Sequence, residues 1–450
     1  MTSSTTGTTT SATDDSSTRP RVPAQVYLLA AAIFCLGTSE FMIAGLLEPI
    51  SADLGISIPQ AGLLITGFAV GMIVGAPAMA LLTLRLPRRA TMIITIVAFS
   101  ALHILGALAP NYPILMLSRV LSAVACGGFW AVAAVHTTRI APVQVRGRAL
   151  ASLVGGLTVA NLVGVPMGAW IGAQFGWRAT FWAIAIVTAA AAVLIAVMTR
   201  PSADRDSAAE AADRSAVHLP TLVRAELAAF RGPRIWLALS TTALFQASVF
   251  AAFSYFSPLL TQIAGIPHDF VPGVLAAFGI GAFIGVVVGG RLADRTVFGN
   301  IVGSLTALAL SLFALWLVAG VGWAAIVVIV LIGASGFSIA GALNARVFQI
   351  ATEAPTLAAS VNTSAFNVGN ALGPAAGAAV IALGWGFRAP VVVAILLALA
   401  ALGVAAVAIR GERAWRQRQI AEVGAETAPN PTDGDPDRNT SSCGAAGKAE

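Results

Sequence analysis

The stretch GGLTVANLVGVPMGAWIGAQFGWRATFW, Gly155 to Trp182, combines an apolar composition with glycines at a fixed spacing. Its glycines at positions 164, 168, 172 and 176 recur every four residues, so they lie along one slowly drifting face of a helix with 3.6 residues per turn. A face without side chains lets a second helix approach closely, and membrane helices pack on faces of this kind. The stretch therefore predicts a membrane helix packed tightly against a partner.

The same arrangement of an asparagine, two glycines and a later glycine with an arginine returns in the second half of the chain. The corresponding positions are Asn161 with Asn370, Gly164 with Gly373, Gly168 with Gly377, Gly176 with Gly386, and Arg178 with Arg388. A second stripe, Gly71 and Gly75, is matched in the same way by Gly281 and Gly285. The chain is thus predicted to be a duplication.

The composition requires a bilayer, because 57% of the residues are hydrophobic and only 10% are charged. Twelve apolar segments are predicted to cross it: 24–47, 60–83, 90–109, 114–136, 149–172, 179–199, 234–258, 272–290, 300–320, 324–346, 358–383 and 389–409. At 1.5 Å per residue each spans ~30 Å or more, except the eighth, at about 28 Å. We expect an all-α integral membrane protein with two six-helix repeats.

The net charge of +6 could suggest nucleic acid, but the basic residues are dispersed and gather on one side of the predicted membrane. With the N-terminus placed in the cytoplasm, the loops on that side contain Arg85, Arg88, Arg89, Arg139, Arg146, Arg148, Arg291, Arg295 and Arg346. The opposite side has only Arg178 and Arg388. The positive-inside rule therefore predicts a multi-pass protein of the cell membrane with both termini cytoplasmic.

Five regions follow from these segments. Residues 1–23 form a Thr/Ser-rich tail that is expected to be disordered rather than a cleaved signal peptide. The six-helix halves occupy 24–199 and 234–410, and a polar cytoplasmic linker, 200–233, joins them. The charged, Pro/Gly-rich residues 411–450 are expected to form a second disordered tail.

Glu40, in the first segment, is the one carboxylate that falls well inside a predicted span. A charge at membrane depth costs roughly 2.5–3.5 kcal/mol on insertion scales, so it is usually retained for a pathway or a partner. Arg119, in the fourth segment, lies at a similar depth, and the two are predicted to meet if their helices are neighbours; the resemblance described below implies that they couple a proton. The alternatives are a Glu40 that faces a wet vestibule and an Arg119 that snorkels outward. Glu48 and Asp53 fall in an outer loop and are expected to be solvated.

The transporter resemblance described below implies a substrate cavity between the two halves. Its predicted lining is aromatic with one polar amide, and consists of Phe41, Trp130, Gln246, Phe250, Phe253 and Tyr255. Such a cavity suits a neutral or weakly charged aromatic amphiphile. The aromatic residues could equally face lipid. Asn362, Asn367 and Asn370 in the eleventh segment could bind substrate or join helices by hydrogen bonds.

Two six-helix halves in a parallel repeat resemble the major facilitator superfamily of secondary transporters. The loop GRLADR, with Gly290, Asp294 and Arg295, is similar to the superfamily's signature loop, and the resemblance implies a cytoplasmic gating role for these residues and for Arg85. The first-half copy departs from it, with Ala80, Leu84 and Pro87 at signature positions. RVLSAVACGG from Arg119 is similar to the fourth-helix motif whose arginine is linked with proton coupling.

GVPMG, with Gly164, Pro166 and Gly168, resembles the fifth-helix antiporter motif in its GVP form, and Gly373, Pro374 and Gly377 repeat it. The resemblance implies that helices 2 with 11 and 5 with 8 meet between the halves, and we expect their glycines to pack there. Over about residues 24–410 the chain resembles twelve-helix drug:proton antiporters of bacteria, in particular the chloramphenicol exporters of actinobacteria. Sugar and purine exporters share the GTSEF and GVP stretches.

The favoured function is therefore proton-driven export of a small amphiphilic drug, chloramphenicol first, by alternating access. One alternative is an exporter of sugars or nucleosides, and another is a membrane sensor that does not transport. The expected partners are the cargo, protons and lipid, with no cofactor other than the proton gradient and with the chain acting as a monomer. The sequence offers no nucleophile–base pair, metal spacing or phosphate loop, so no enzyme is expected. His103 and His136 have no partners in sequence and are expected to be structural.

Overall fold

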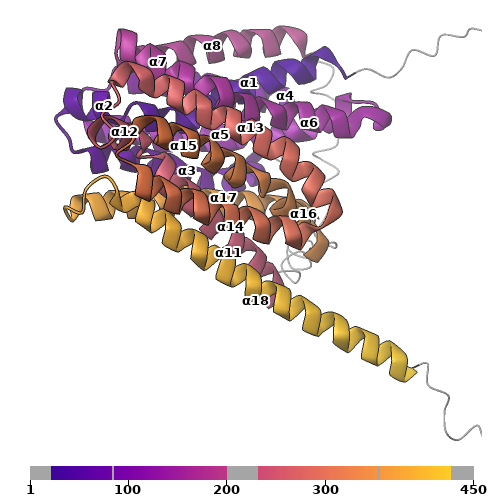
Figure 1. The fold of residues 1–450 in the computed structure, drawn as a ribbon. Coiled ribbons are helices and arrows are strands. Elements are labelled where there is room, and N and C mark those ends of the chain that lie inside the picture. The colour runs from indigo at the N-terminus through magenta and orange to yellow at the C-terminus, as the bar shows by residue number, and fades with distance from the viewer. Residues whose placement is uncertain (1–21, 84–85, 200–231, 352–354, 427–450) are drawn as a thin grey trace, which may run out of the picture.

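The computed structural model describes residues 22–83, 86–199, 232–351 and 355–426 (Figure 1). Within these ranges twelve helical stretches are long and apolar enough to cross a membrane, and each overlaps one of the predicted segments. The predicted all-α membrane fold is confirmed.

The first half contains six spans, some of them built from more than one helix. Its elements are α1 (Ala24–Phe41), η1 (Met42–Gly45), α2 (Leu47–Leu54), α3 (Ile58–Thr83), α4 (Arg88–Ala107), α5 (Tyr112–Ile140), η2 (Val143–Val145), α6 (Arg146–Val159), η3 (Ala160–Gly164), α7 (Val165–Phe175) and α8 (Trp177–Met198). The spans Ala24–Gly45 and Val143–Phe175 combine α1 with η1, and η2 with α6, η3 and α7.

The second half repeats this plan. Its elements are α11 (Pro233–Phe253), α12 (Phe256–Gln262), η4 (His268–Phe270), α13 (Val271–Arg295), α14 (Val297–Val318), α15 (Gly322–Ser338), α16 (Ala340–Ile350), α17 (Pro355–Ala382) and α18 (Ala389–Glu426). Gly176 and Gly386 lie in the connections that follow the fifth and eleventh spans, and both have positive φ, of 85° and 77°. Since glycine adopts such angles without strain, the two repeats turn at equivalent places.

The fifth span contains a local irregularity at Pro166. Proline has no backbone N–H and cannot continue the regular hydrogen-bond ladder, and the residues just before it, η3, form a π-helical turn. The interior of this turn lies against the other half, because a Cβ added to Gly279 of α13 would come within 2.7 Å of Asn161 O and Leu162 Cα. The proline therefore shapes a contact surface between the halves.

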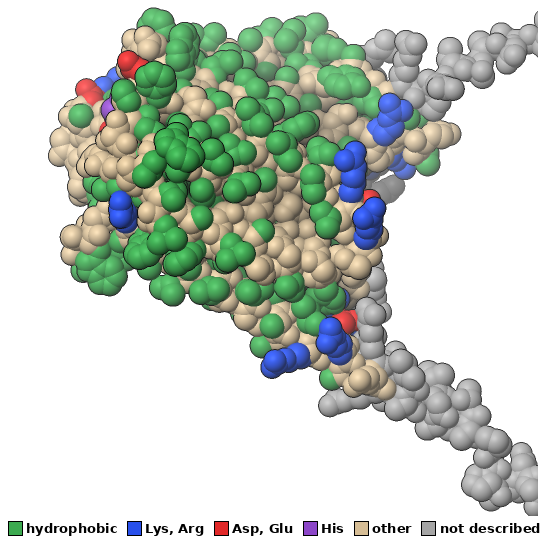
Figure 2. Space-filling model, in the orientation of Figure 1, with side chains coloured by type: hydrophobic (Ala, Val, Ile, Leu, Met, Phe, Trp, Pro, Cys, Tyr) green, Lys and Arg blue, Asp and Glu red, His purple; other side chains and the backbone are tan. Residues whose placement is uncertain are grey.

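The two halves meet through the helix pairs that the resemblance implied. α3 packs along α17, and α13 packs against η3 and α7. α1 begins and α18 ends at the same end of the bundle, which we call the terminal end; α2 and α12 lie at the opposite end, which we call the far end (Figure 1). Hydrophobic side chains cover most of the flank between these ends, and Lys and Arg gather toward the terminal end (Figure 2).

The glycine stripes face their own half rather than the other one. A Cβ on Gly164 or Gly168 would meet Thr38 or Met42 of the first span, and a Cβ on Gly373 or Gly377 would meet α11 or Tyr255. The stripe of α3 faces α5, and the stripe of α13 faces α15. The expectation that these glycines pack between the halves is therefore wrong for this conformation: the helices meet, but on other faces.

The terminal end differs from the expected domain limits. α18 continues beyond residue 410 to Glu426, where a disordered tail was expected from 411. The extra turns contain good helix formers, and the buried Glu412 carboxylate contacts Arg234 and accepts a 2.7 Å hydrogen bond from Arg346. The predicted linker, apart from its last two residues, and the N-terminal tail up to residue 21 lie outside the described residues.

Candidate functional site

Glu40 lies in the last turn of α1, half-buried, where the two halves meet. Its Oε1 accepts a 3.1 Å hydrogen bond from the amide of Asn370 on α17. The Asn370 Oδ1 in turn accepts a 2.8 Å bond from Gln246 Nε2 on α11. The Glu40 carboxylate of the first half is thus hydrogen-bonded to a linked pair of amide side chains of the second half.

Arg119 of α5 is fully buried at the same level, but it does not pair with the Glu40 carboxylate. Its two terminal nitrogens each donate a 2.9 Å bond to Ser39, one to Oγ and one to the carbonyl, and one reaches the Glu40 carbonyl at 3.4 Å. The guanidinium also lies over Phe68, 4.5 Å from the ring centre. No ion pair within 4.0 Å joins Glu40 and Arg119 in the described part of the chain. Glu40 and Arg119 therefore lie at the same depth, and Arg119 contacts the Glu40 backbone carbonyl, but their side chains are not paired.

His103 of α4 completes this polar cluster, although no partner for it could be identified from the sequence. Its Nδ1 lies 2.8 Å from the Phe99 carbonyl and its Nε2 lies 2.6 Å from Ser39 Oγ. Because a carbonyl can only accept, Nδ1 carries the hydrogen, and in the neutral ring Nε2 accepts from the Ser39 hydroxyl. Ser39 then links His103 to Arg119. The only sequence signal was the position of Ser39 beside Glu40 in GTSEF.

The Ser39 contacts lead to a stability prediction. In Ser39→Ala, Arg119 and His103 both lose a buried partner, and we expect the free energy of unfolding to fall by about 1–3 kcal/mol. Ser254 is the matched control, because it is also fully buried but its Oγ has no hydrogen-bond partner among the described residues. Ser254→Ala should leave the melting temperature of the detergent-purified protein unchanged or slightly raised. Equal melting temperatures for the two variants would contradict the network.

The predicted aromatic lining divides into two groups. Phe41 stacks across the interface on Phe250, with ring centres 5.2 Å apart, and Phe250 contacts Phe253 at 5.4 Å. The cluster continues to Phe278, 4.8 Å from Phe253. All four rings are buried, so in this conformation they close the space beside Glu40 rather than line an open chamber.

Tyr255 and Trp130 are placed elsewhere. The Tyr255 hydroxyl donates a 2.8 Å bond to the Pro374 carbonyl, and its ring is enclosed by Gly62 and Gly377. Tyr255 therefore joins helices rather than facing a cavity. Trp130, half-buried on α5, packs on the core without a ring contact to the other described aromatic residues.

The predicted gating loop makes no closing contact. Gly290, Asp294 and Arg295 are exposed, and neither Asp294 nor Arg295 forms a hydrogen bond or ion pair with any described residue. Arg85 lies outside the described residues. Among the described residues, Asp294 and Arg295 thus make no gating contact in this conformation.

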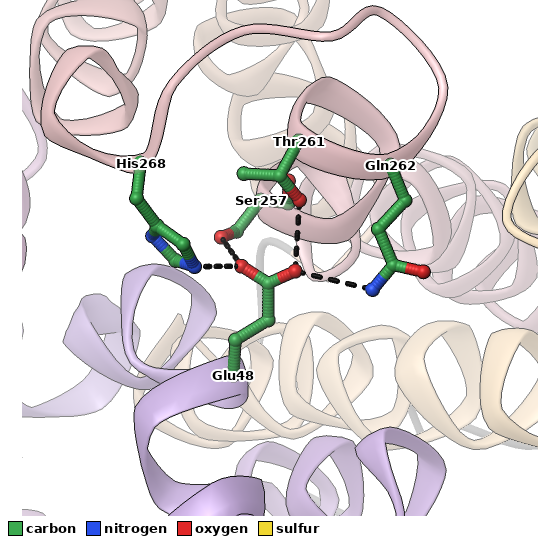
Figure 3. Close-up of polar contacts among 5 residues, drawn as sticks. All are labelled: Glu48, Ser257, Thr261, Gln262 and His268. Carbon is green, nitrogen blue, oxygen red and sulfur yellow. Dashed lines mark hydrogen bonds and ion pairs between the residues drawn. The ribbon is translucent and has the colours of Figure 1, made fainter.

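Two carboxylates lie at the far end of the bundle, and both were expected to be solvated. Asp53 is exposed, as expected, whereas Glu48 is largely buried. Asp53 of α2 pairs with Arg178 and accepts a 3.1 Å bond from Trp177, both in its own half. The hydrogen bond from Arg178 is the largest cause that lowers the pKa of Asp53 below its usual value. Glu48 instead contacts four side chains of the second half: Ser257, Thr261, Gln262 and His268 (Figure 3). Sequence reasoning missed Glu48 because its partners lie in a distant part of the chain.

Comparison with known proteins agrees with this architecture. The family model of the Major Facilitator Superfamily matches residues 29–363. The chain is 40% identical to a chloramphenicol resistance protein of Streptomyces lividans over 85% of this chain and 96% of that protein. It is 31% identical to a probable sugar efflux transporter of Mannheimia succiniciproducens, over 77% of this chain and 84% of that protein.

A solved structure shares the fold. It is a bacterial homolog of the human lysosomal transporter Spinster in an inward-facing, occupied conformation, with a TM-score of 0.68, 18% sequence identity, and coverage of 86% of this chain and 96% of that one. At this identity the likeness concerns the fold alone. The family match and the extent of the relatives' similarity, together with the twelve spans, lead to one conclusion: the chain is a multi-pass membrane transporter of the Major Facilitator Superfamily.

Proposed function

We propose that the protein is a proton-driven exporter of a small amphiphilic drug, with chloramphenicol as the first candidate, and that it works as a monomer by alternating access. The observation that carries the proposal is the Glu40–Asn370 hydrogen bond, which joins a membrane-embedded carboxylate to the opposite half. When the halves rock apart, this bond must break or move. The protonation of Glu40 is therefore linked to the conformation of the protein.

Arg119 has a supporting role in this cycle. In the described conformation its guanidinium is held by Ser39, one residue from Glu40. A rotation of α1 brings the Glu40 side chain rather than Ser39 toward Arg119, and the positive charge then favours the ionised carboxylate. Proton release from Glu40 would accompany that rotation. Asn370 takes the place of Arg119 as the partner of Glu40 when the far end is closed.

The orientation of the protein in the membrane follows from the distribution of charge. The exposed arginines Arg139, Arg146, Arg148 and Arg291 lie near the ends of α5, α6 and α13, on the side that the positive-inside rule assigns to the cytoplasm, so the terminal end would be cytoplasmic and the far end extracellular. Closed at the far end, the described conformation corresponds to an inward-facing state. Protons that return through Glu40 would supply ~2.3 kcal/mol per 100 mV each.

The drug assignment is supported by the apolar surroundings of Glu40. Phe41, Phe250 and Phe253 offer three aromatic rings beside the Glu40–Asn370–Gln246 chain, so an aromatic amphiphile could stack on rings while its polar groups meet amides. The similarity to the Streptomyces chloramphenicol resistance protein agrees with this cargo.

A sugar is the second candidate, because amides also gather at the site. Besides Asn370 and Gln246, α17 contains Asn367, a buried residue whose Oδ1 has no hydrogen-bond partner. This amide oxygen suits a hydroxyl group of a polyhydroxylated ligand, and a relative is named as a probable sugar efflux transporter.

A direct transport assay separates the two cargoes. We expect everted membrane vesicles that contain the protein to accumulate radiolabelled chloramphenicol when respiration acidifies their interior, and an uncoupler to abolish the accumulation. Vesicles without the protein serve as the control, and L-arabinose is tested in parallel. Accumulation of the sugar alone would establish the second candidate, and accumulation of neither would refute both.

A further inference from the structure

Glu48 stands at the far end of the first half, in the first turn of α2. Its side chain is only 14% exposed, although it is a carboxylate at the surface-facing end of the bundle. Ser257, Thr261 and Gln262 reach it from α12, and His268 reaches it from η4 (Figure 3). A carboxylate at this depth needs partners, and all four belong to the other half.

The geometry uses both oxygens of the carboxylate. Oε1 accepts from Thr261 at 2.8 Å and from Gln262 at 3.3 Å, and Oε2 accepts from Ser257 at 3.2 Å and lies in close contact with His268 Nε2. An ionised carboxylate has about four acceptor sites, so this set occupies its full capacity. Hydrogen bonds to a charged group are stronger than those between neutral groups.

Two further observations concern the surroundings of this cluster and its place in the internal repeat. Residues just below it, Met42, Ile43 and Leu47, are fully buried, and a Cβ on Gly45 would lie 3.1 Å from Leu275 of α13. The cluster is also absent from the internal repeat: at the offset that pairs Gly71 with Gly281, Glu48 corresponds to Pro258. The second half therefore has no equivalent carboxylate that could bind to the first half in the same way.

From these contacts we infer that Glu48 is a gating residue that holds the far end shut, and that its bonds to Ser257, Thr261, Gln262 and His268 must break before cargo can leave on that side. This role rests on the proposed alternating-access cycle. Because the acceptor lies in one half and the donors in the other, the halves cannot separate at the far end without parting the cluster. Loss of the Glu48 charge should therefore shift the population toward the state that is open at the far end.

Asp53 supplies a matched control on the same short helix. It is also a carboxylate of α2, but Arg178 and Trp177, its partners, lie in its own half. Separation of the halves leaves those contacts intact. Asp53→Asn should therefore leave the equilibrium between the two states unchanged, whereas Glu48→Gln should not.

The experiment measures the far end directly, without transport. Spin labels are placed at Ala52 of α2 and Val321 before α15, both exposed, after replacement of Cys35, Cys126 and Cys443 by serine. Pulsed electron–electron double resonance then gives the distribution of distances between the two spin labels, one in each half. We expect Glu48→Gln to raise the ratio of long to short distances about tenfold, since 1.4 kcal/mol corresponds to a factor of ten.

Three outcomes would overturn the inference. These are an unchanged distribution in Glu48→Gln, an equal shift in Asp53→Asn, and a shift toward shorter distances. If Glu48→Gln fails to fold, the double variant Ser257→Ala with Thr261→Val removes two donors from the other side and should produce the same lengthening. A shift in distances without chloramphenicol transport would uphold the gate and reject the cargo, so the two failures are distinguishable.

Discussion

Glu40→Gln is expected to abolish uphill export while leaving the protein folded. Glutamine has nearly the same shape and can still bond to Asn370, but it cannot carry a proton through the cycle. At ~2.3 kcal/mol per 100 mV, one coupled proton supports a concentration ratio of roughly 50, and the variant should lose most of that ratio. The measurement is chloramphenicol accumulation in energised cells, with and without an uncoupler.

The control for this variant is Asp53→Asn, a carboxylate change outside the pathway. It should keep uncoupler-sensitive export near that of the wild type. Exchange of labelled for unlabelled drug across the membrane, which needs no net proton movement, should survive in Glu40→Gln. Uncoupler-sensitive export by Glu40→Gln at the wild-type level would remove Glu40 from the mechanism.

Gly289→Ala is expected to have the second large effect, on stability rather than on coupling. A Cβ at Gly289 would overlap the backbone of Ser338 on α15, which has no flexible end that can move away. Overpacking of this kind costs about 1–3 kcal/mol or more, so the melting temperature in detergent should fall by roughly 5 °C.

The next residue gives an unusually close comparison. Gly290 follows Gly289 on the same helix, yet a Cβ there would meet nothing within 4 Å. Gly290→Ala should therefore melt near the wild type or slightly above it, because alanine favours helix. If both variants lost the same stability, the loss could not be attributed to the close packing of α13 on α15, because only Gly289 lies in that contact.

The two-half architecture was predictable because long apolar runs and repeated glycine spacing are properties of the sequence alone. All twelve spans lie where the runs predicted them. The direction in which each stripe faces was not predictable: a stripe shows that a helix packs closely, but it does not identify the neighbour. Gly164 packs on Thr38 of its own half, although its helix also touches the other half.

The candidate site shows the same limit at the scale of one residue. Depth along a helix can be counted, and Glu40 and Arg119 do lie at one level. Successive residues of an α-helix point about 100° apart, so the rotation of α1 decides which of Ser39 and Glu40 faces Arg119. That rotation depends on the packing of neighbouring helices. The same reason hid His103, whose partner Ser39 lies on another helix.

The glycine stripes, which pack on helices of their own half, also affect how this transporter can change its cargo. At Gly285, Gly289 and Gly373 a backbone lies where a side chain would have to go, so mutation there is blocked by folding itself. Phe41 and Phe250 do not face such seams, and under the proposed function substitutions there would alter the surface beside Glu40 that meets the cargo. Under the proposed drug export, selection for export of a new drug should therefore recover substitutions at these side chains and not in the stripes, so the range of cargo can change while the fold does not.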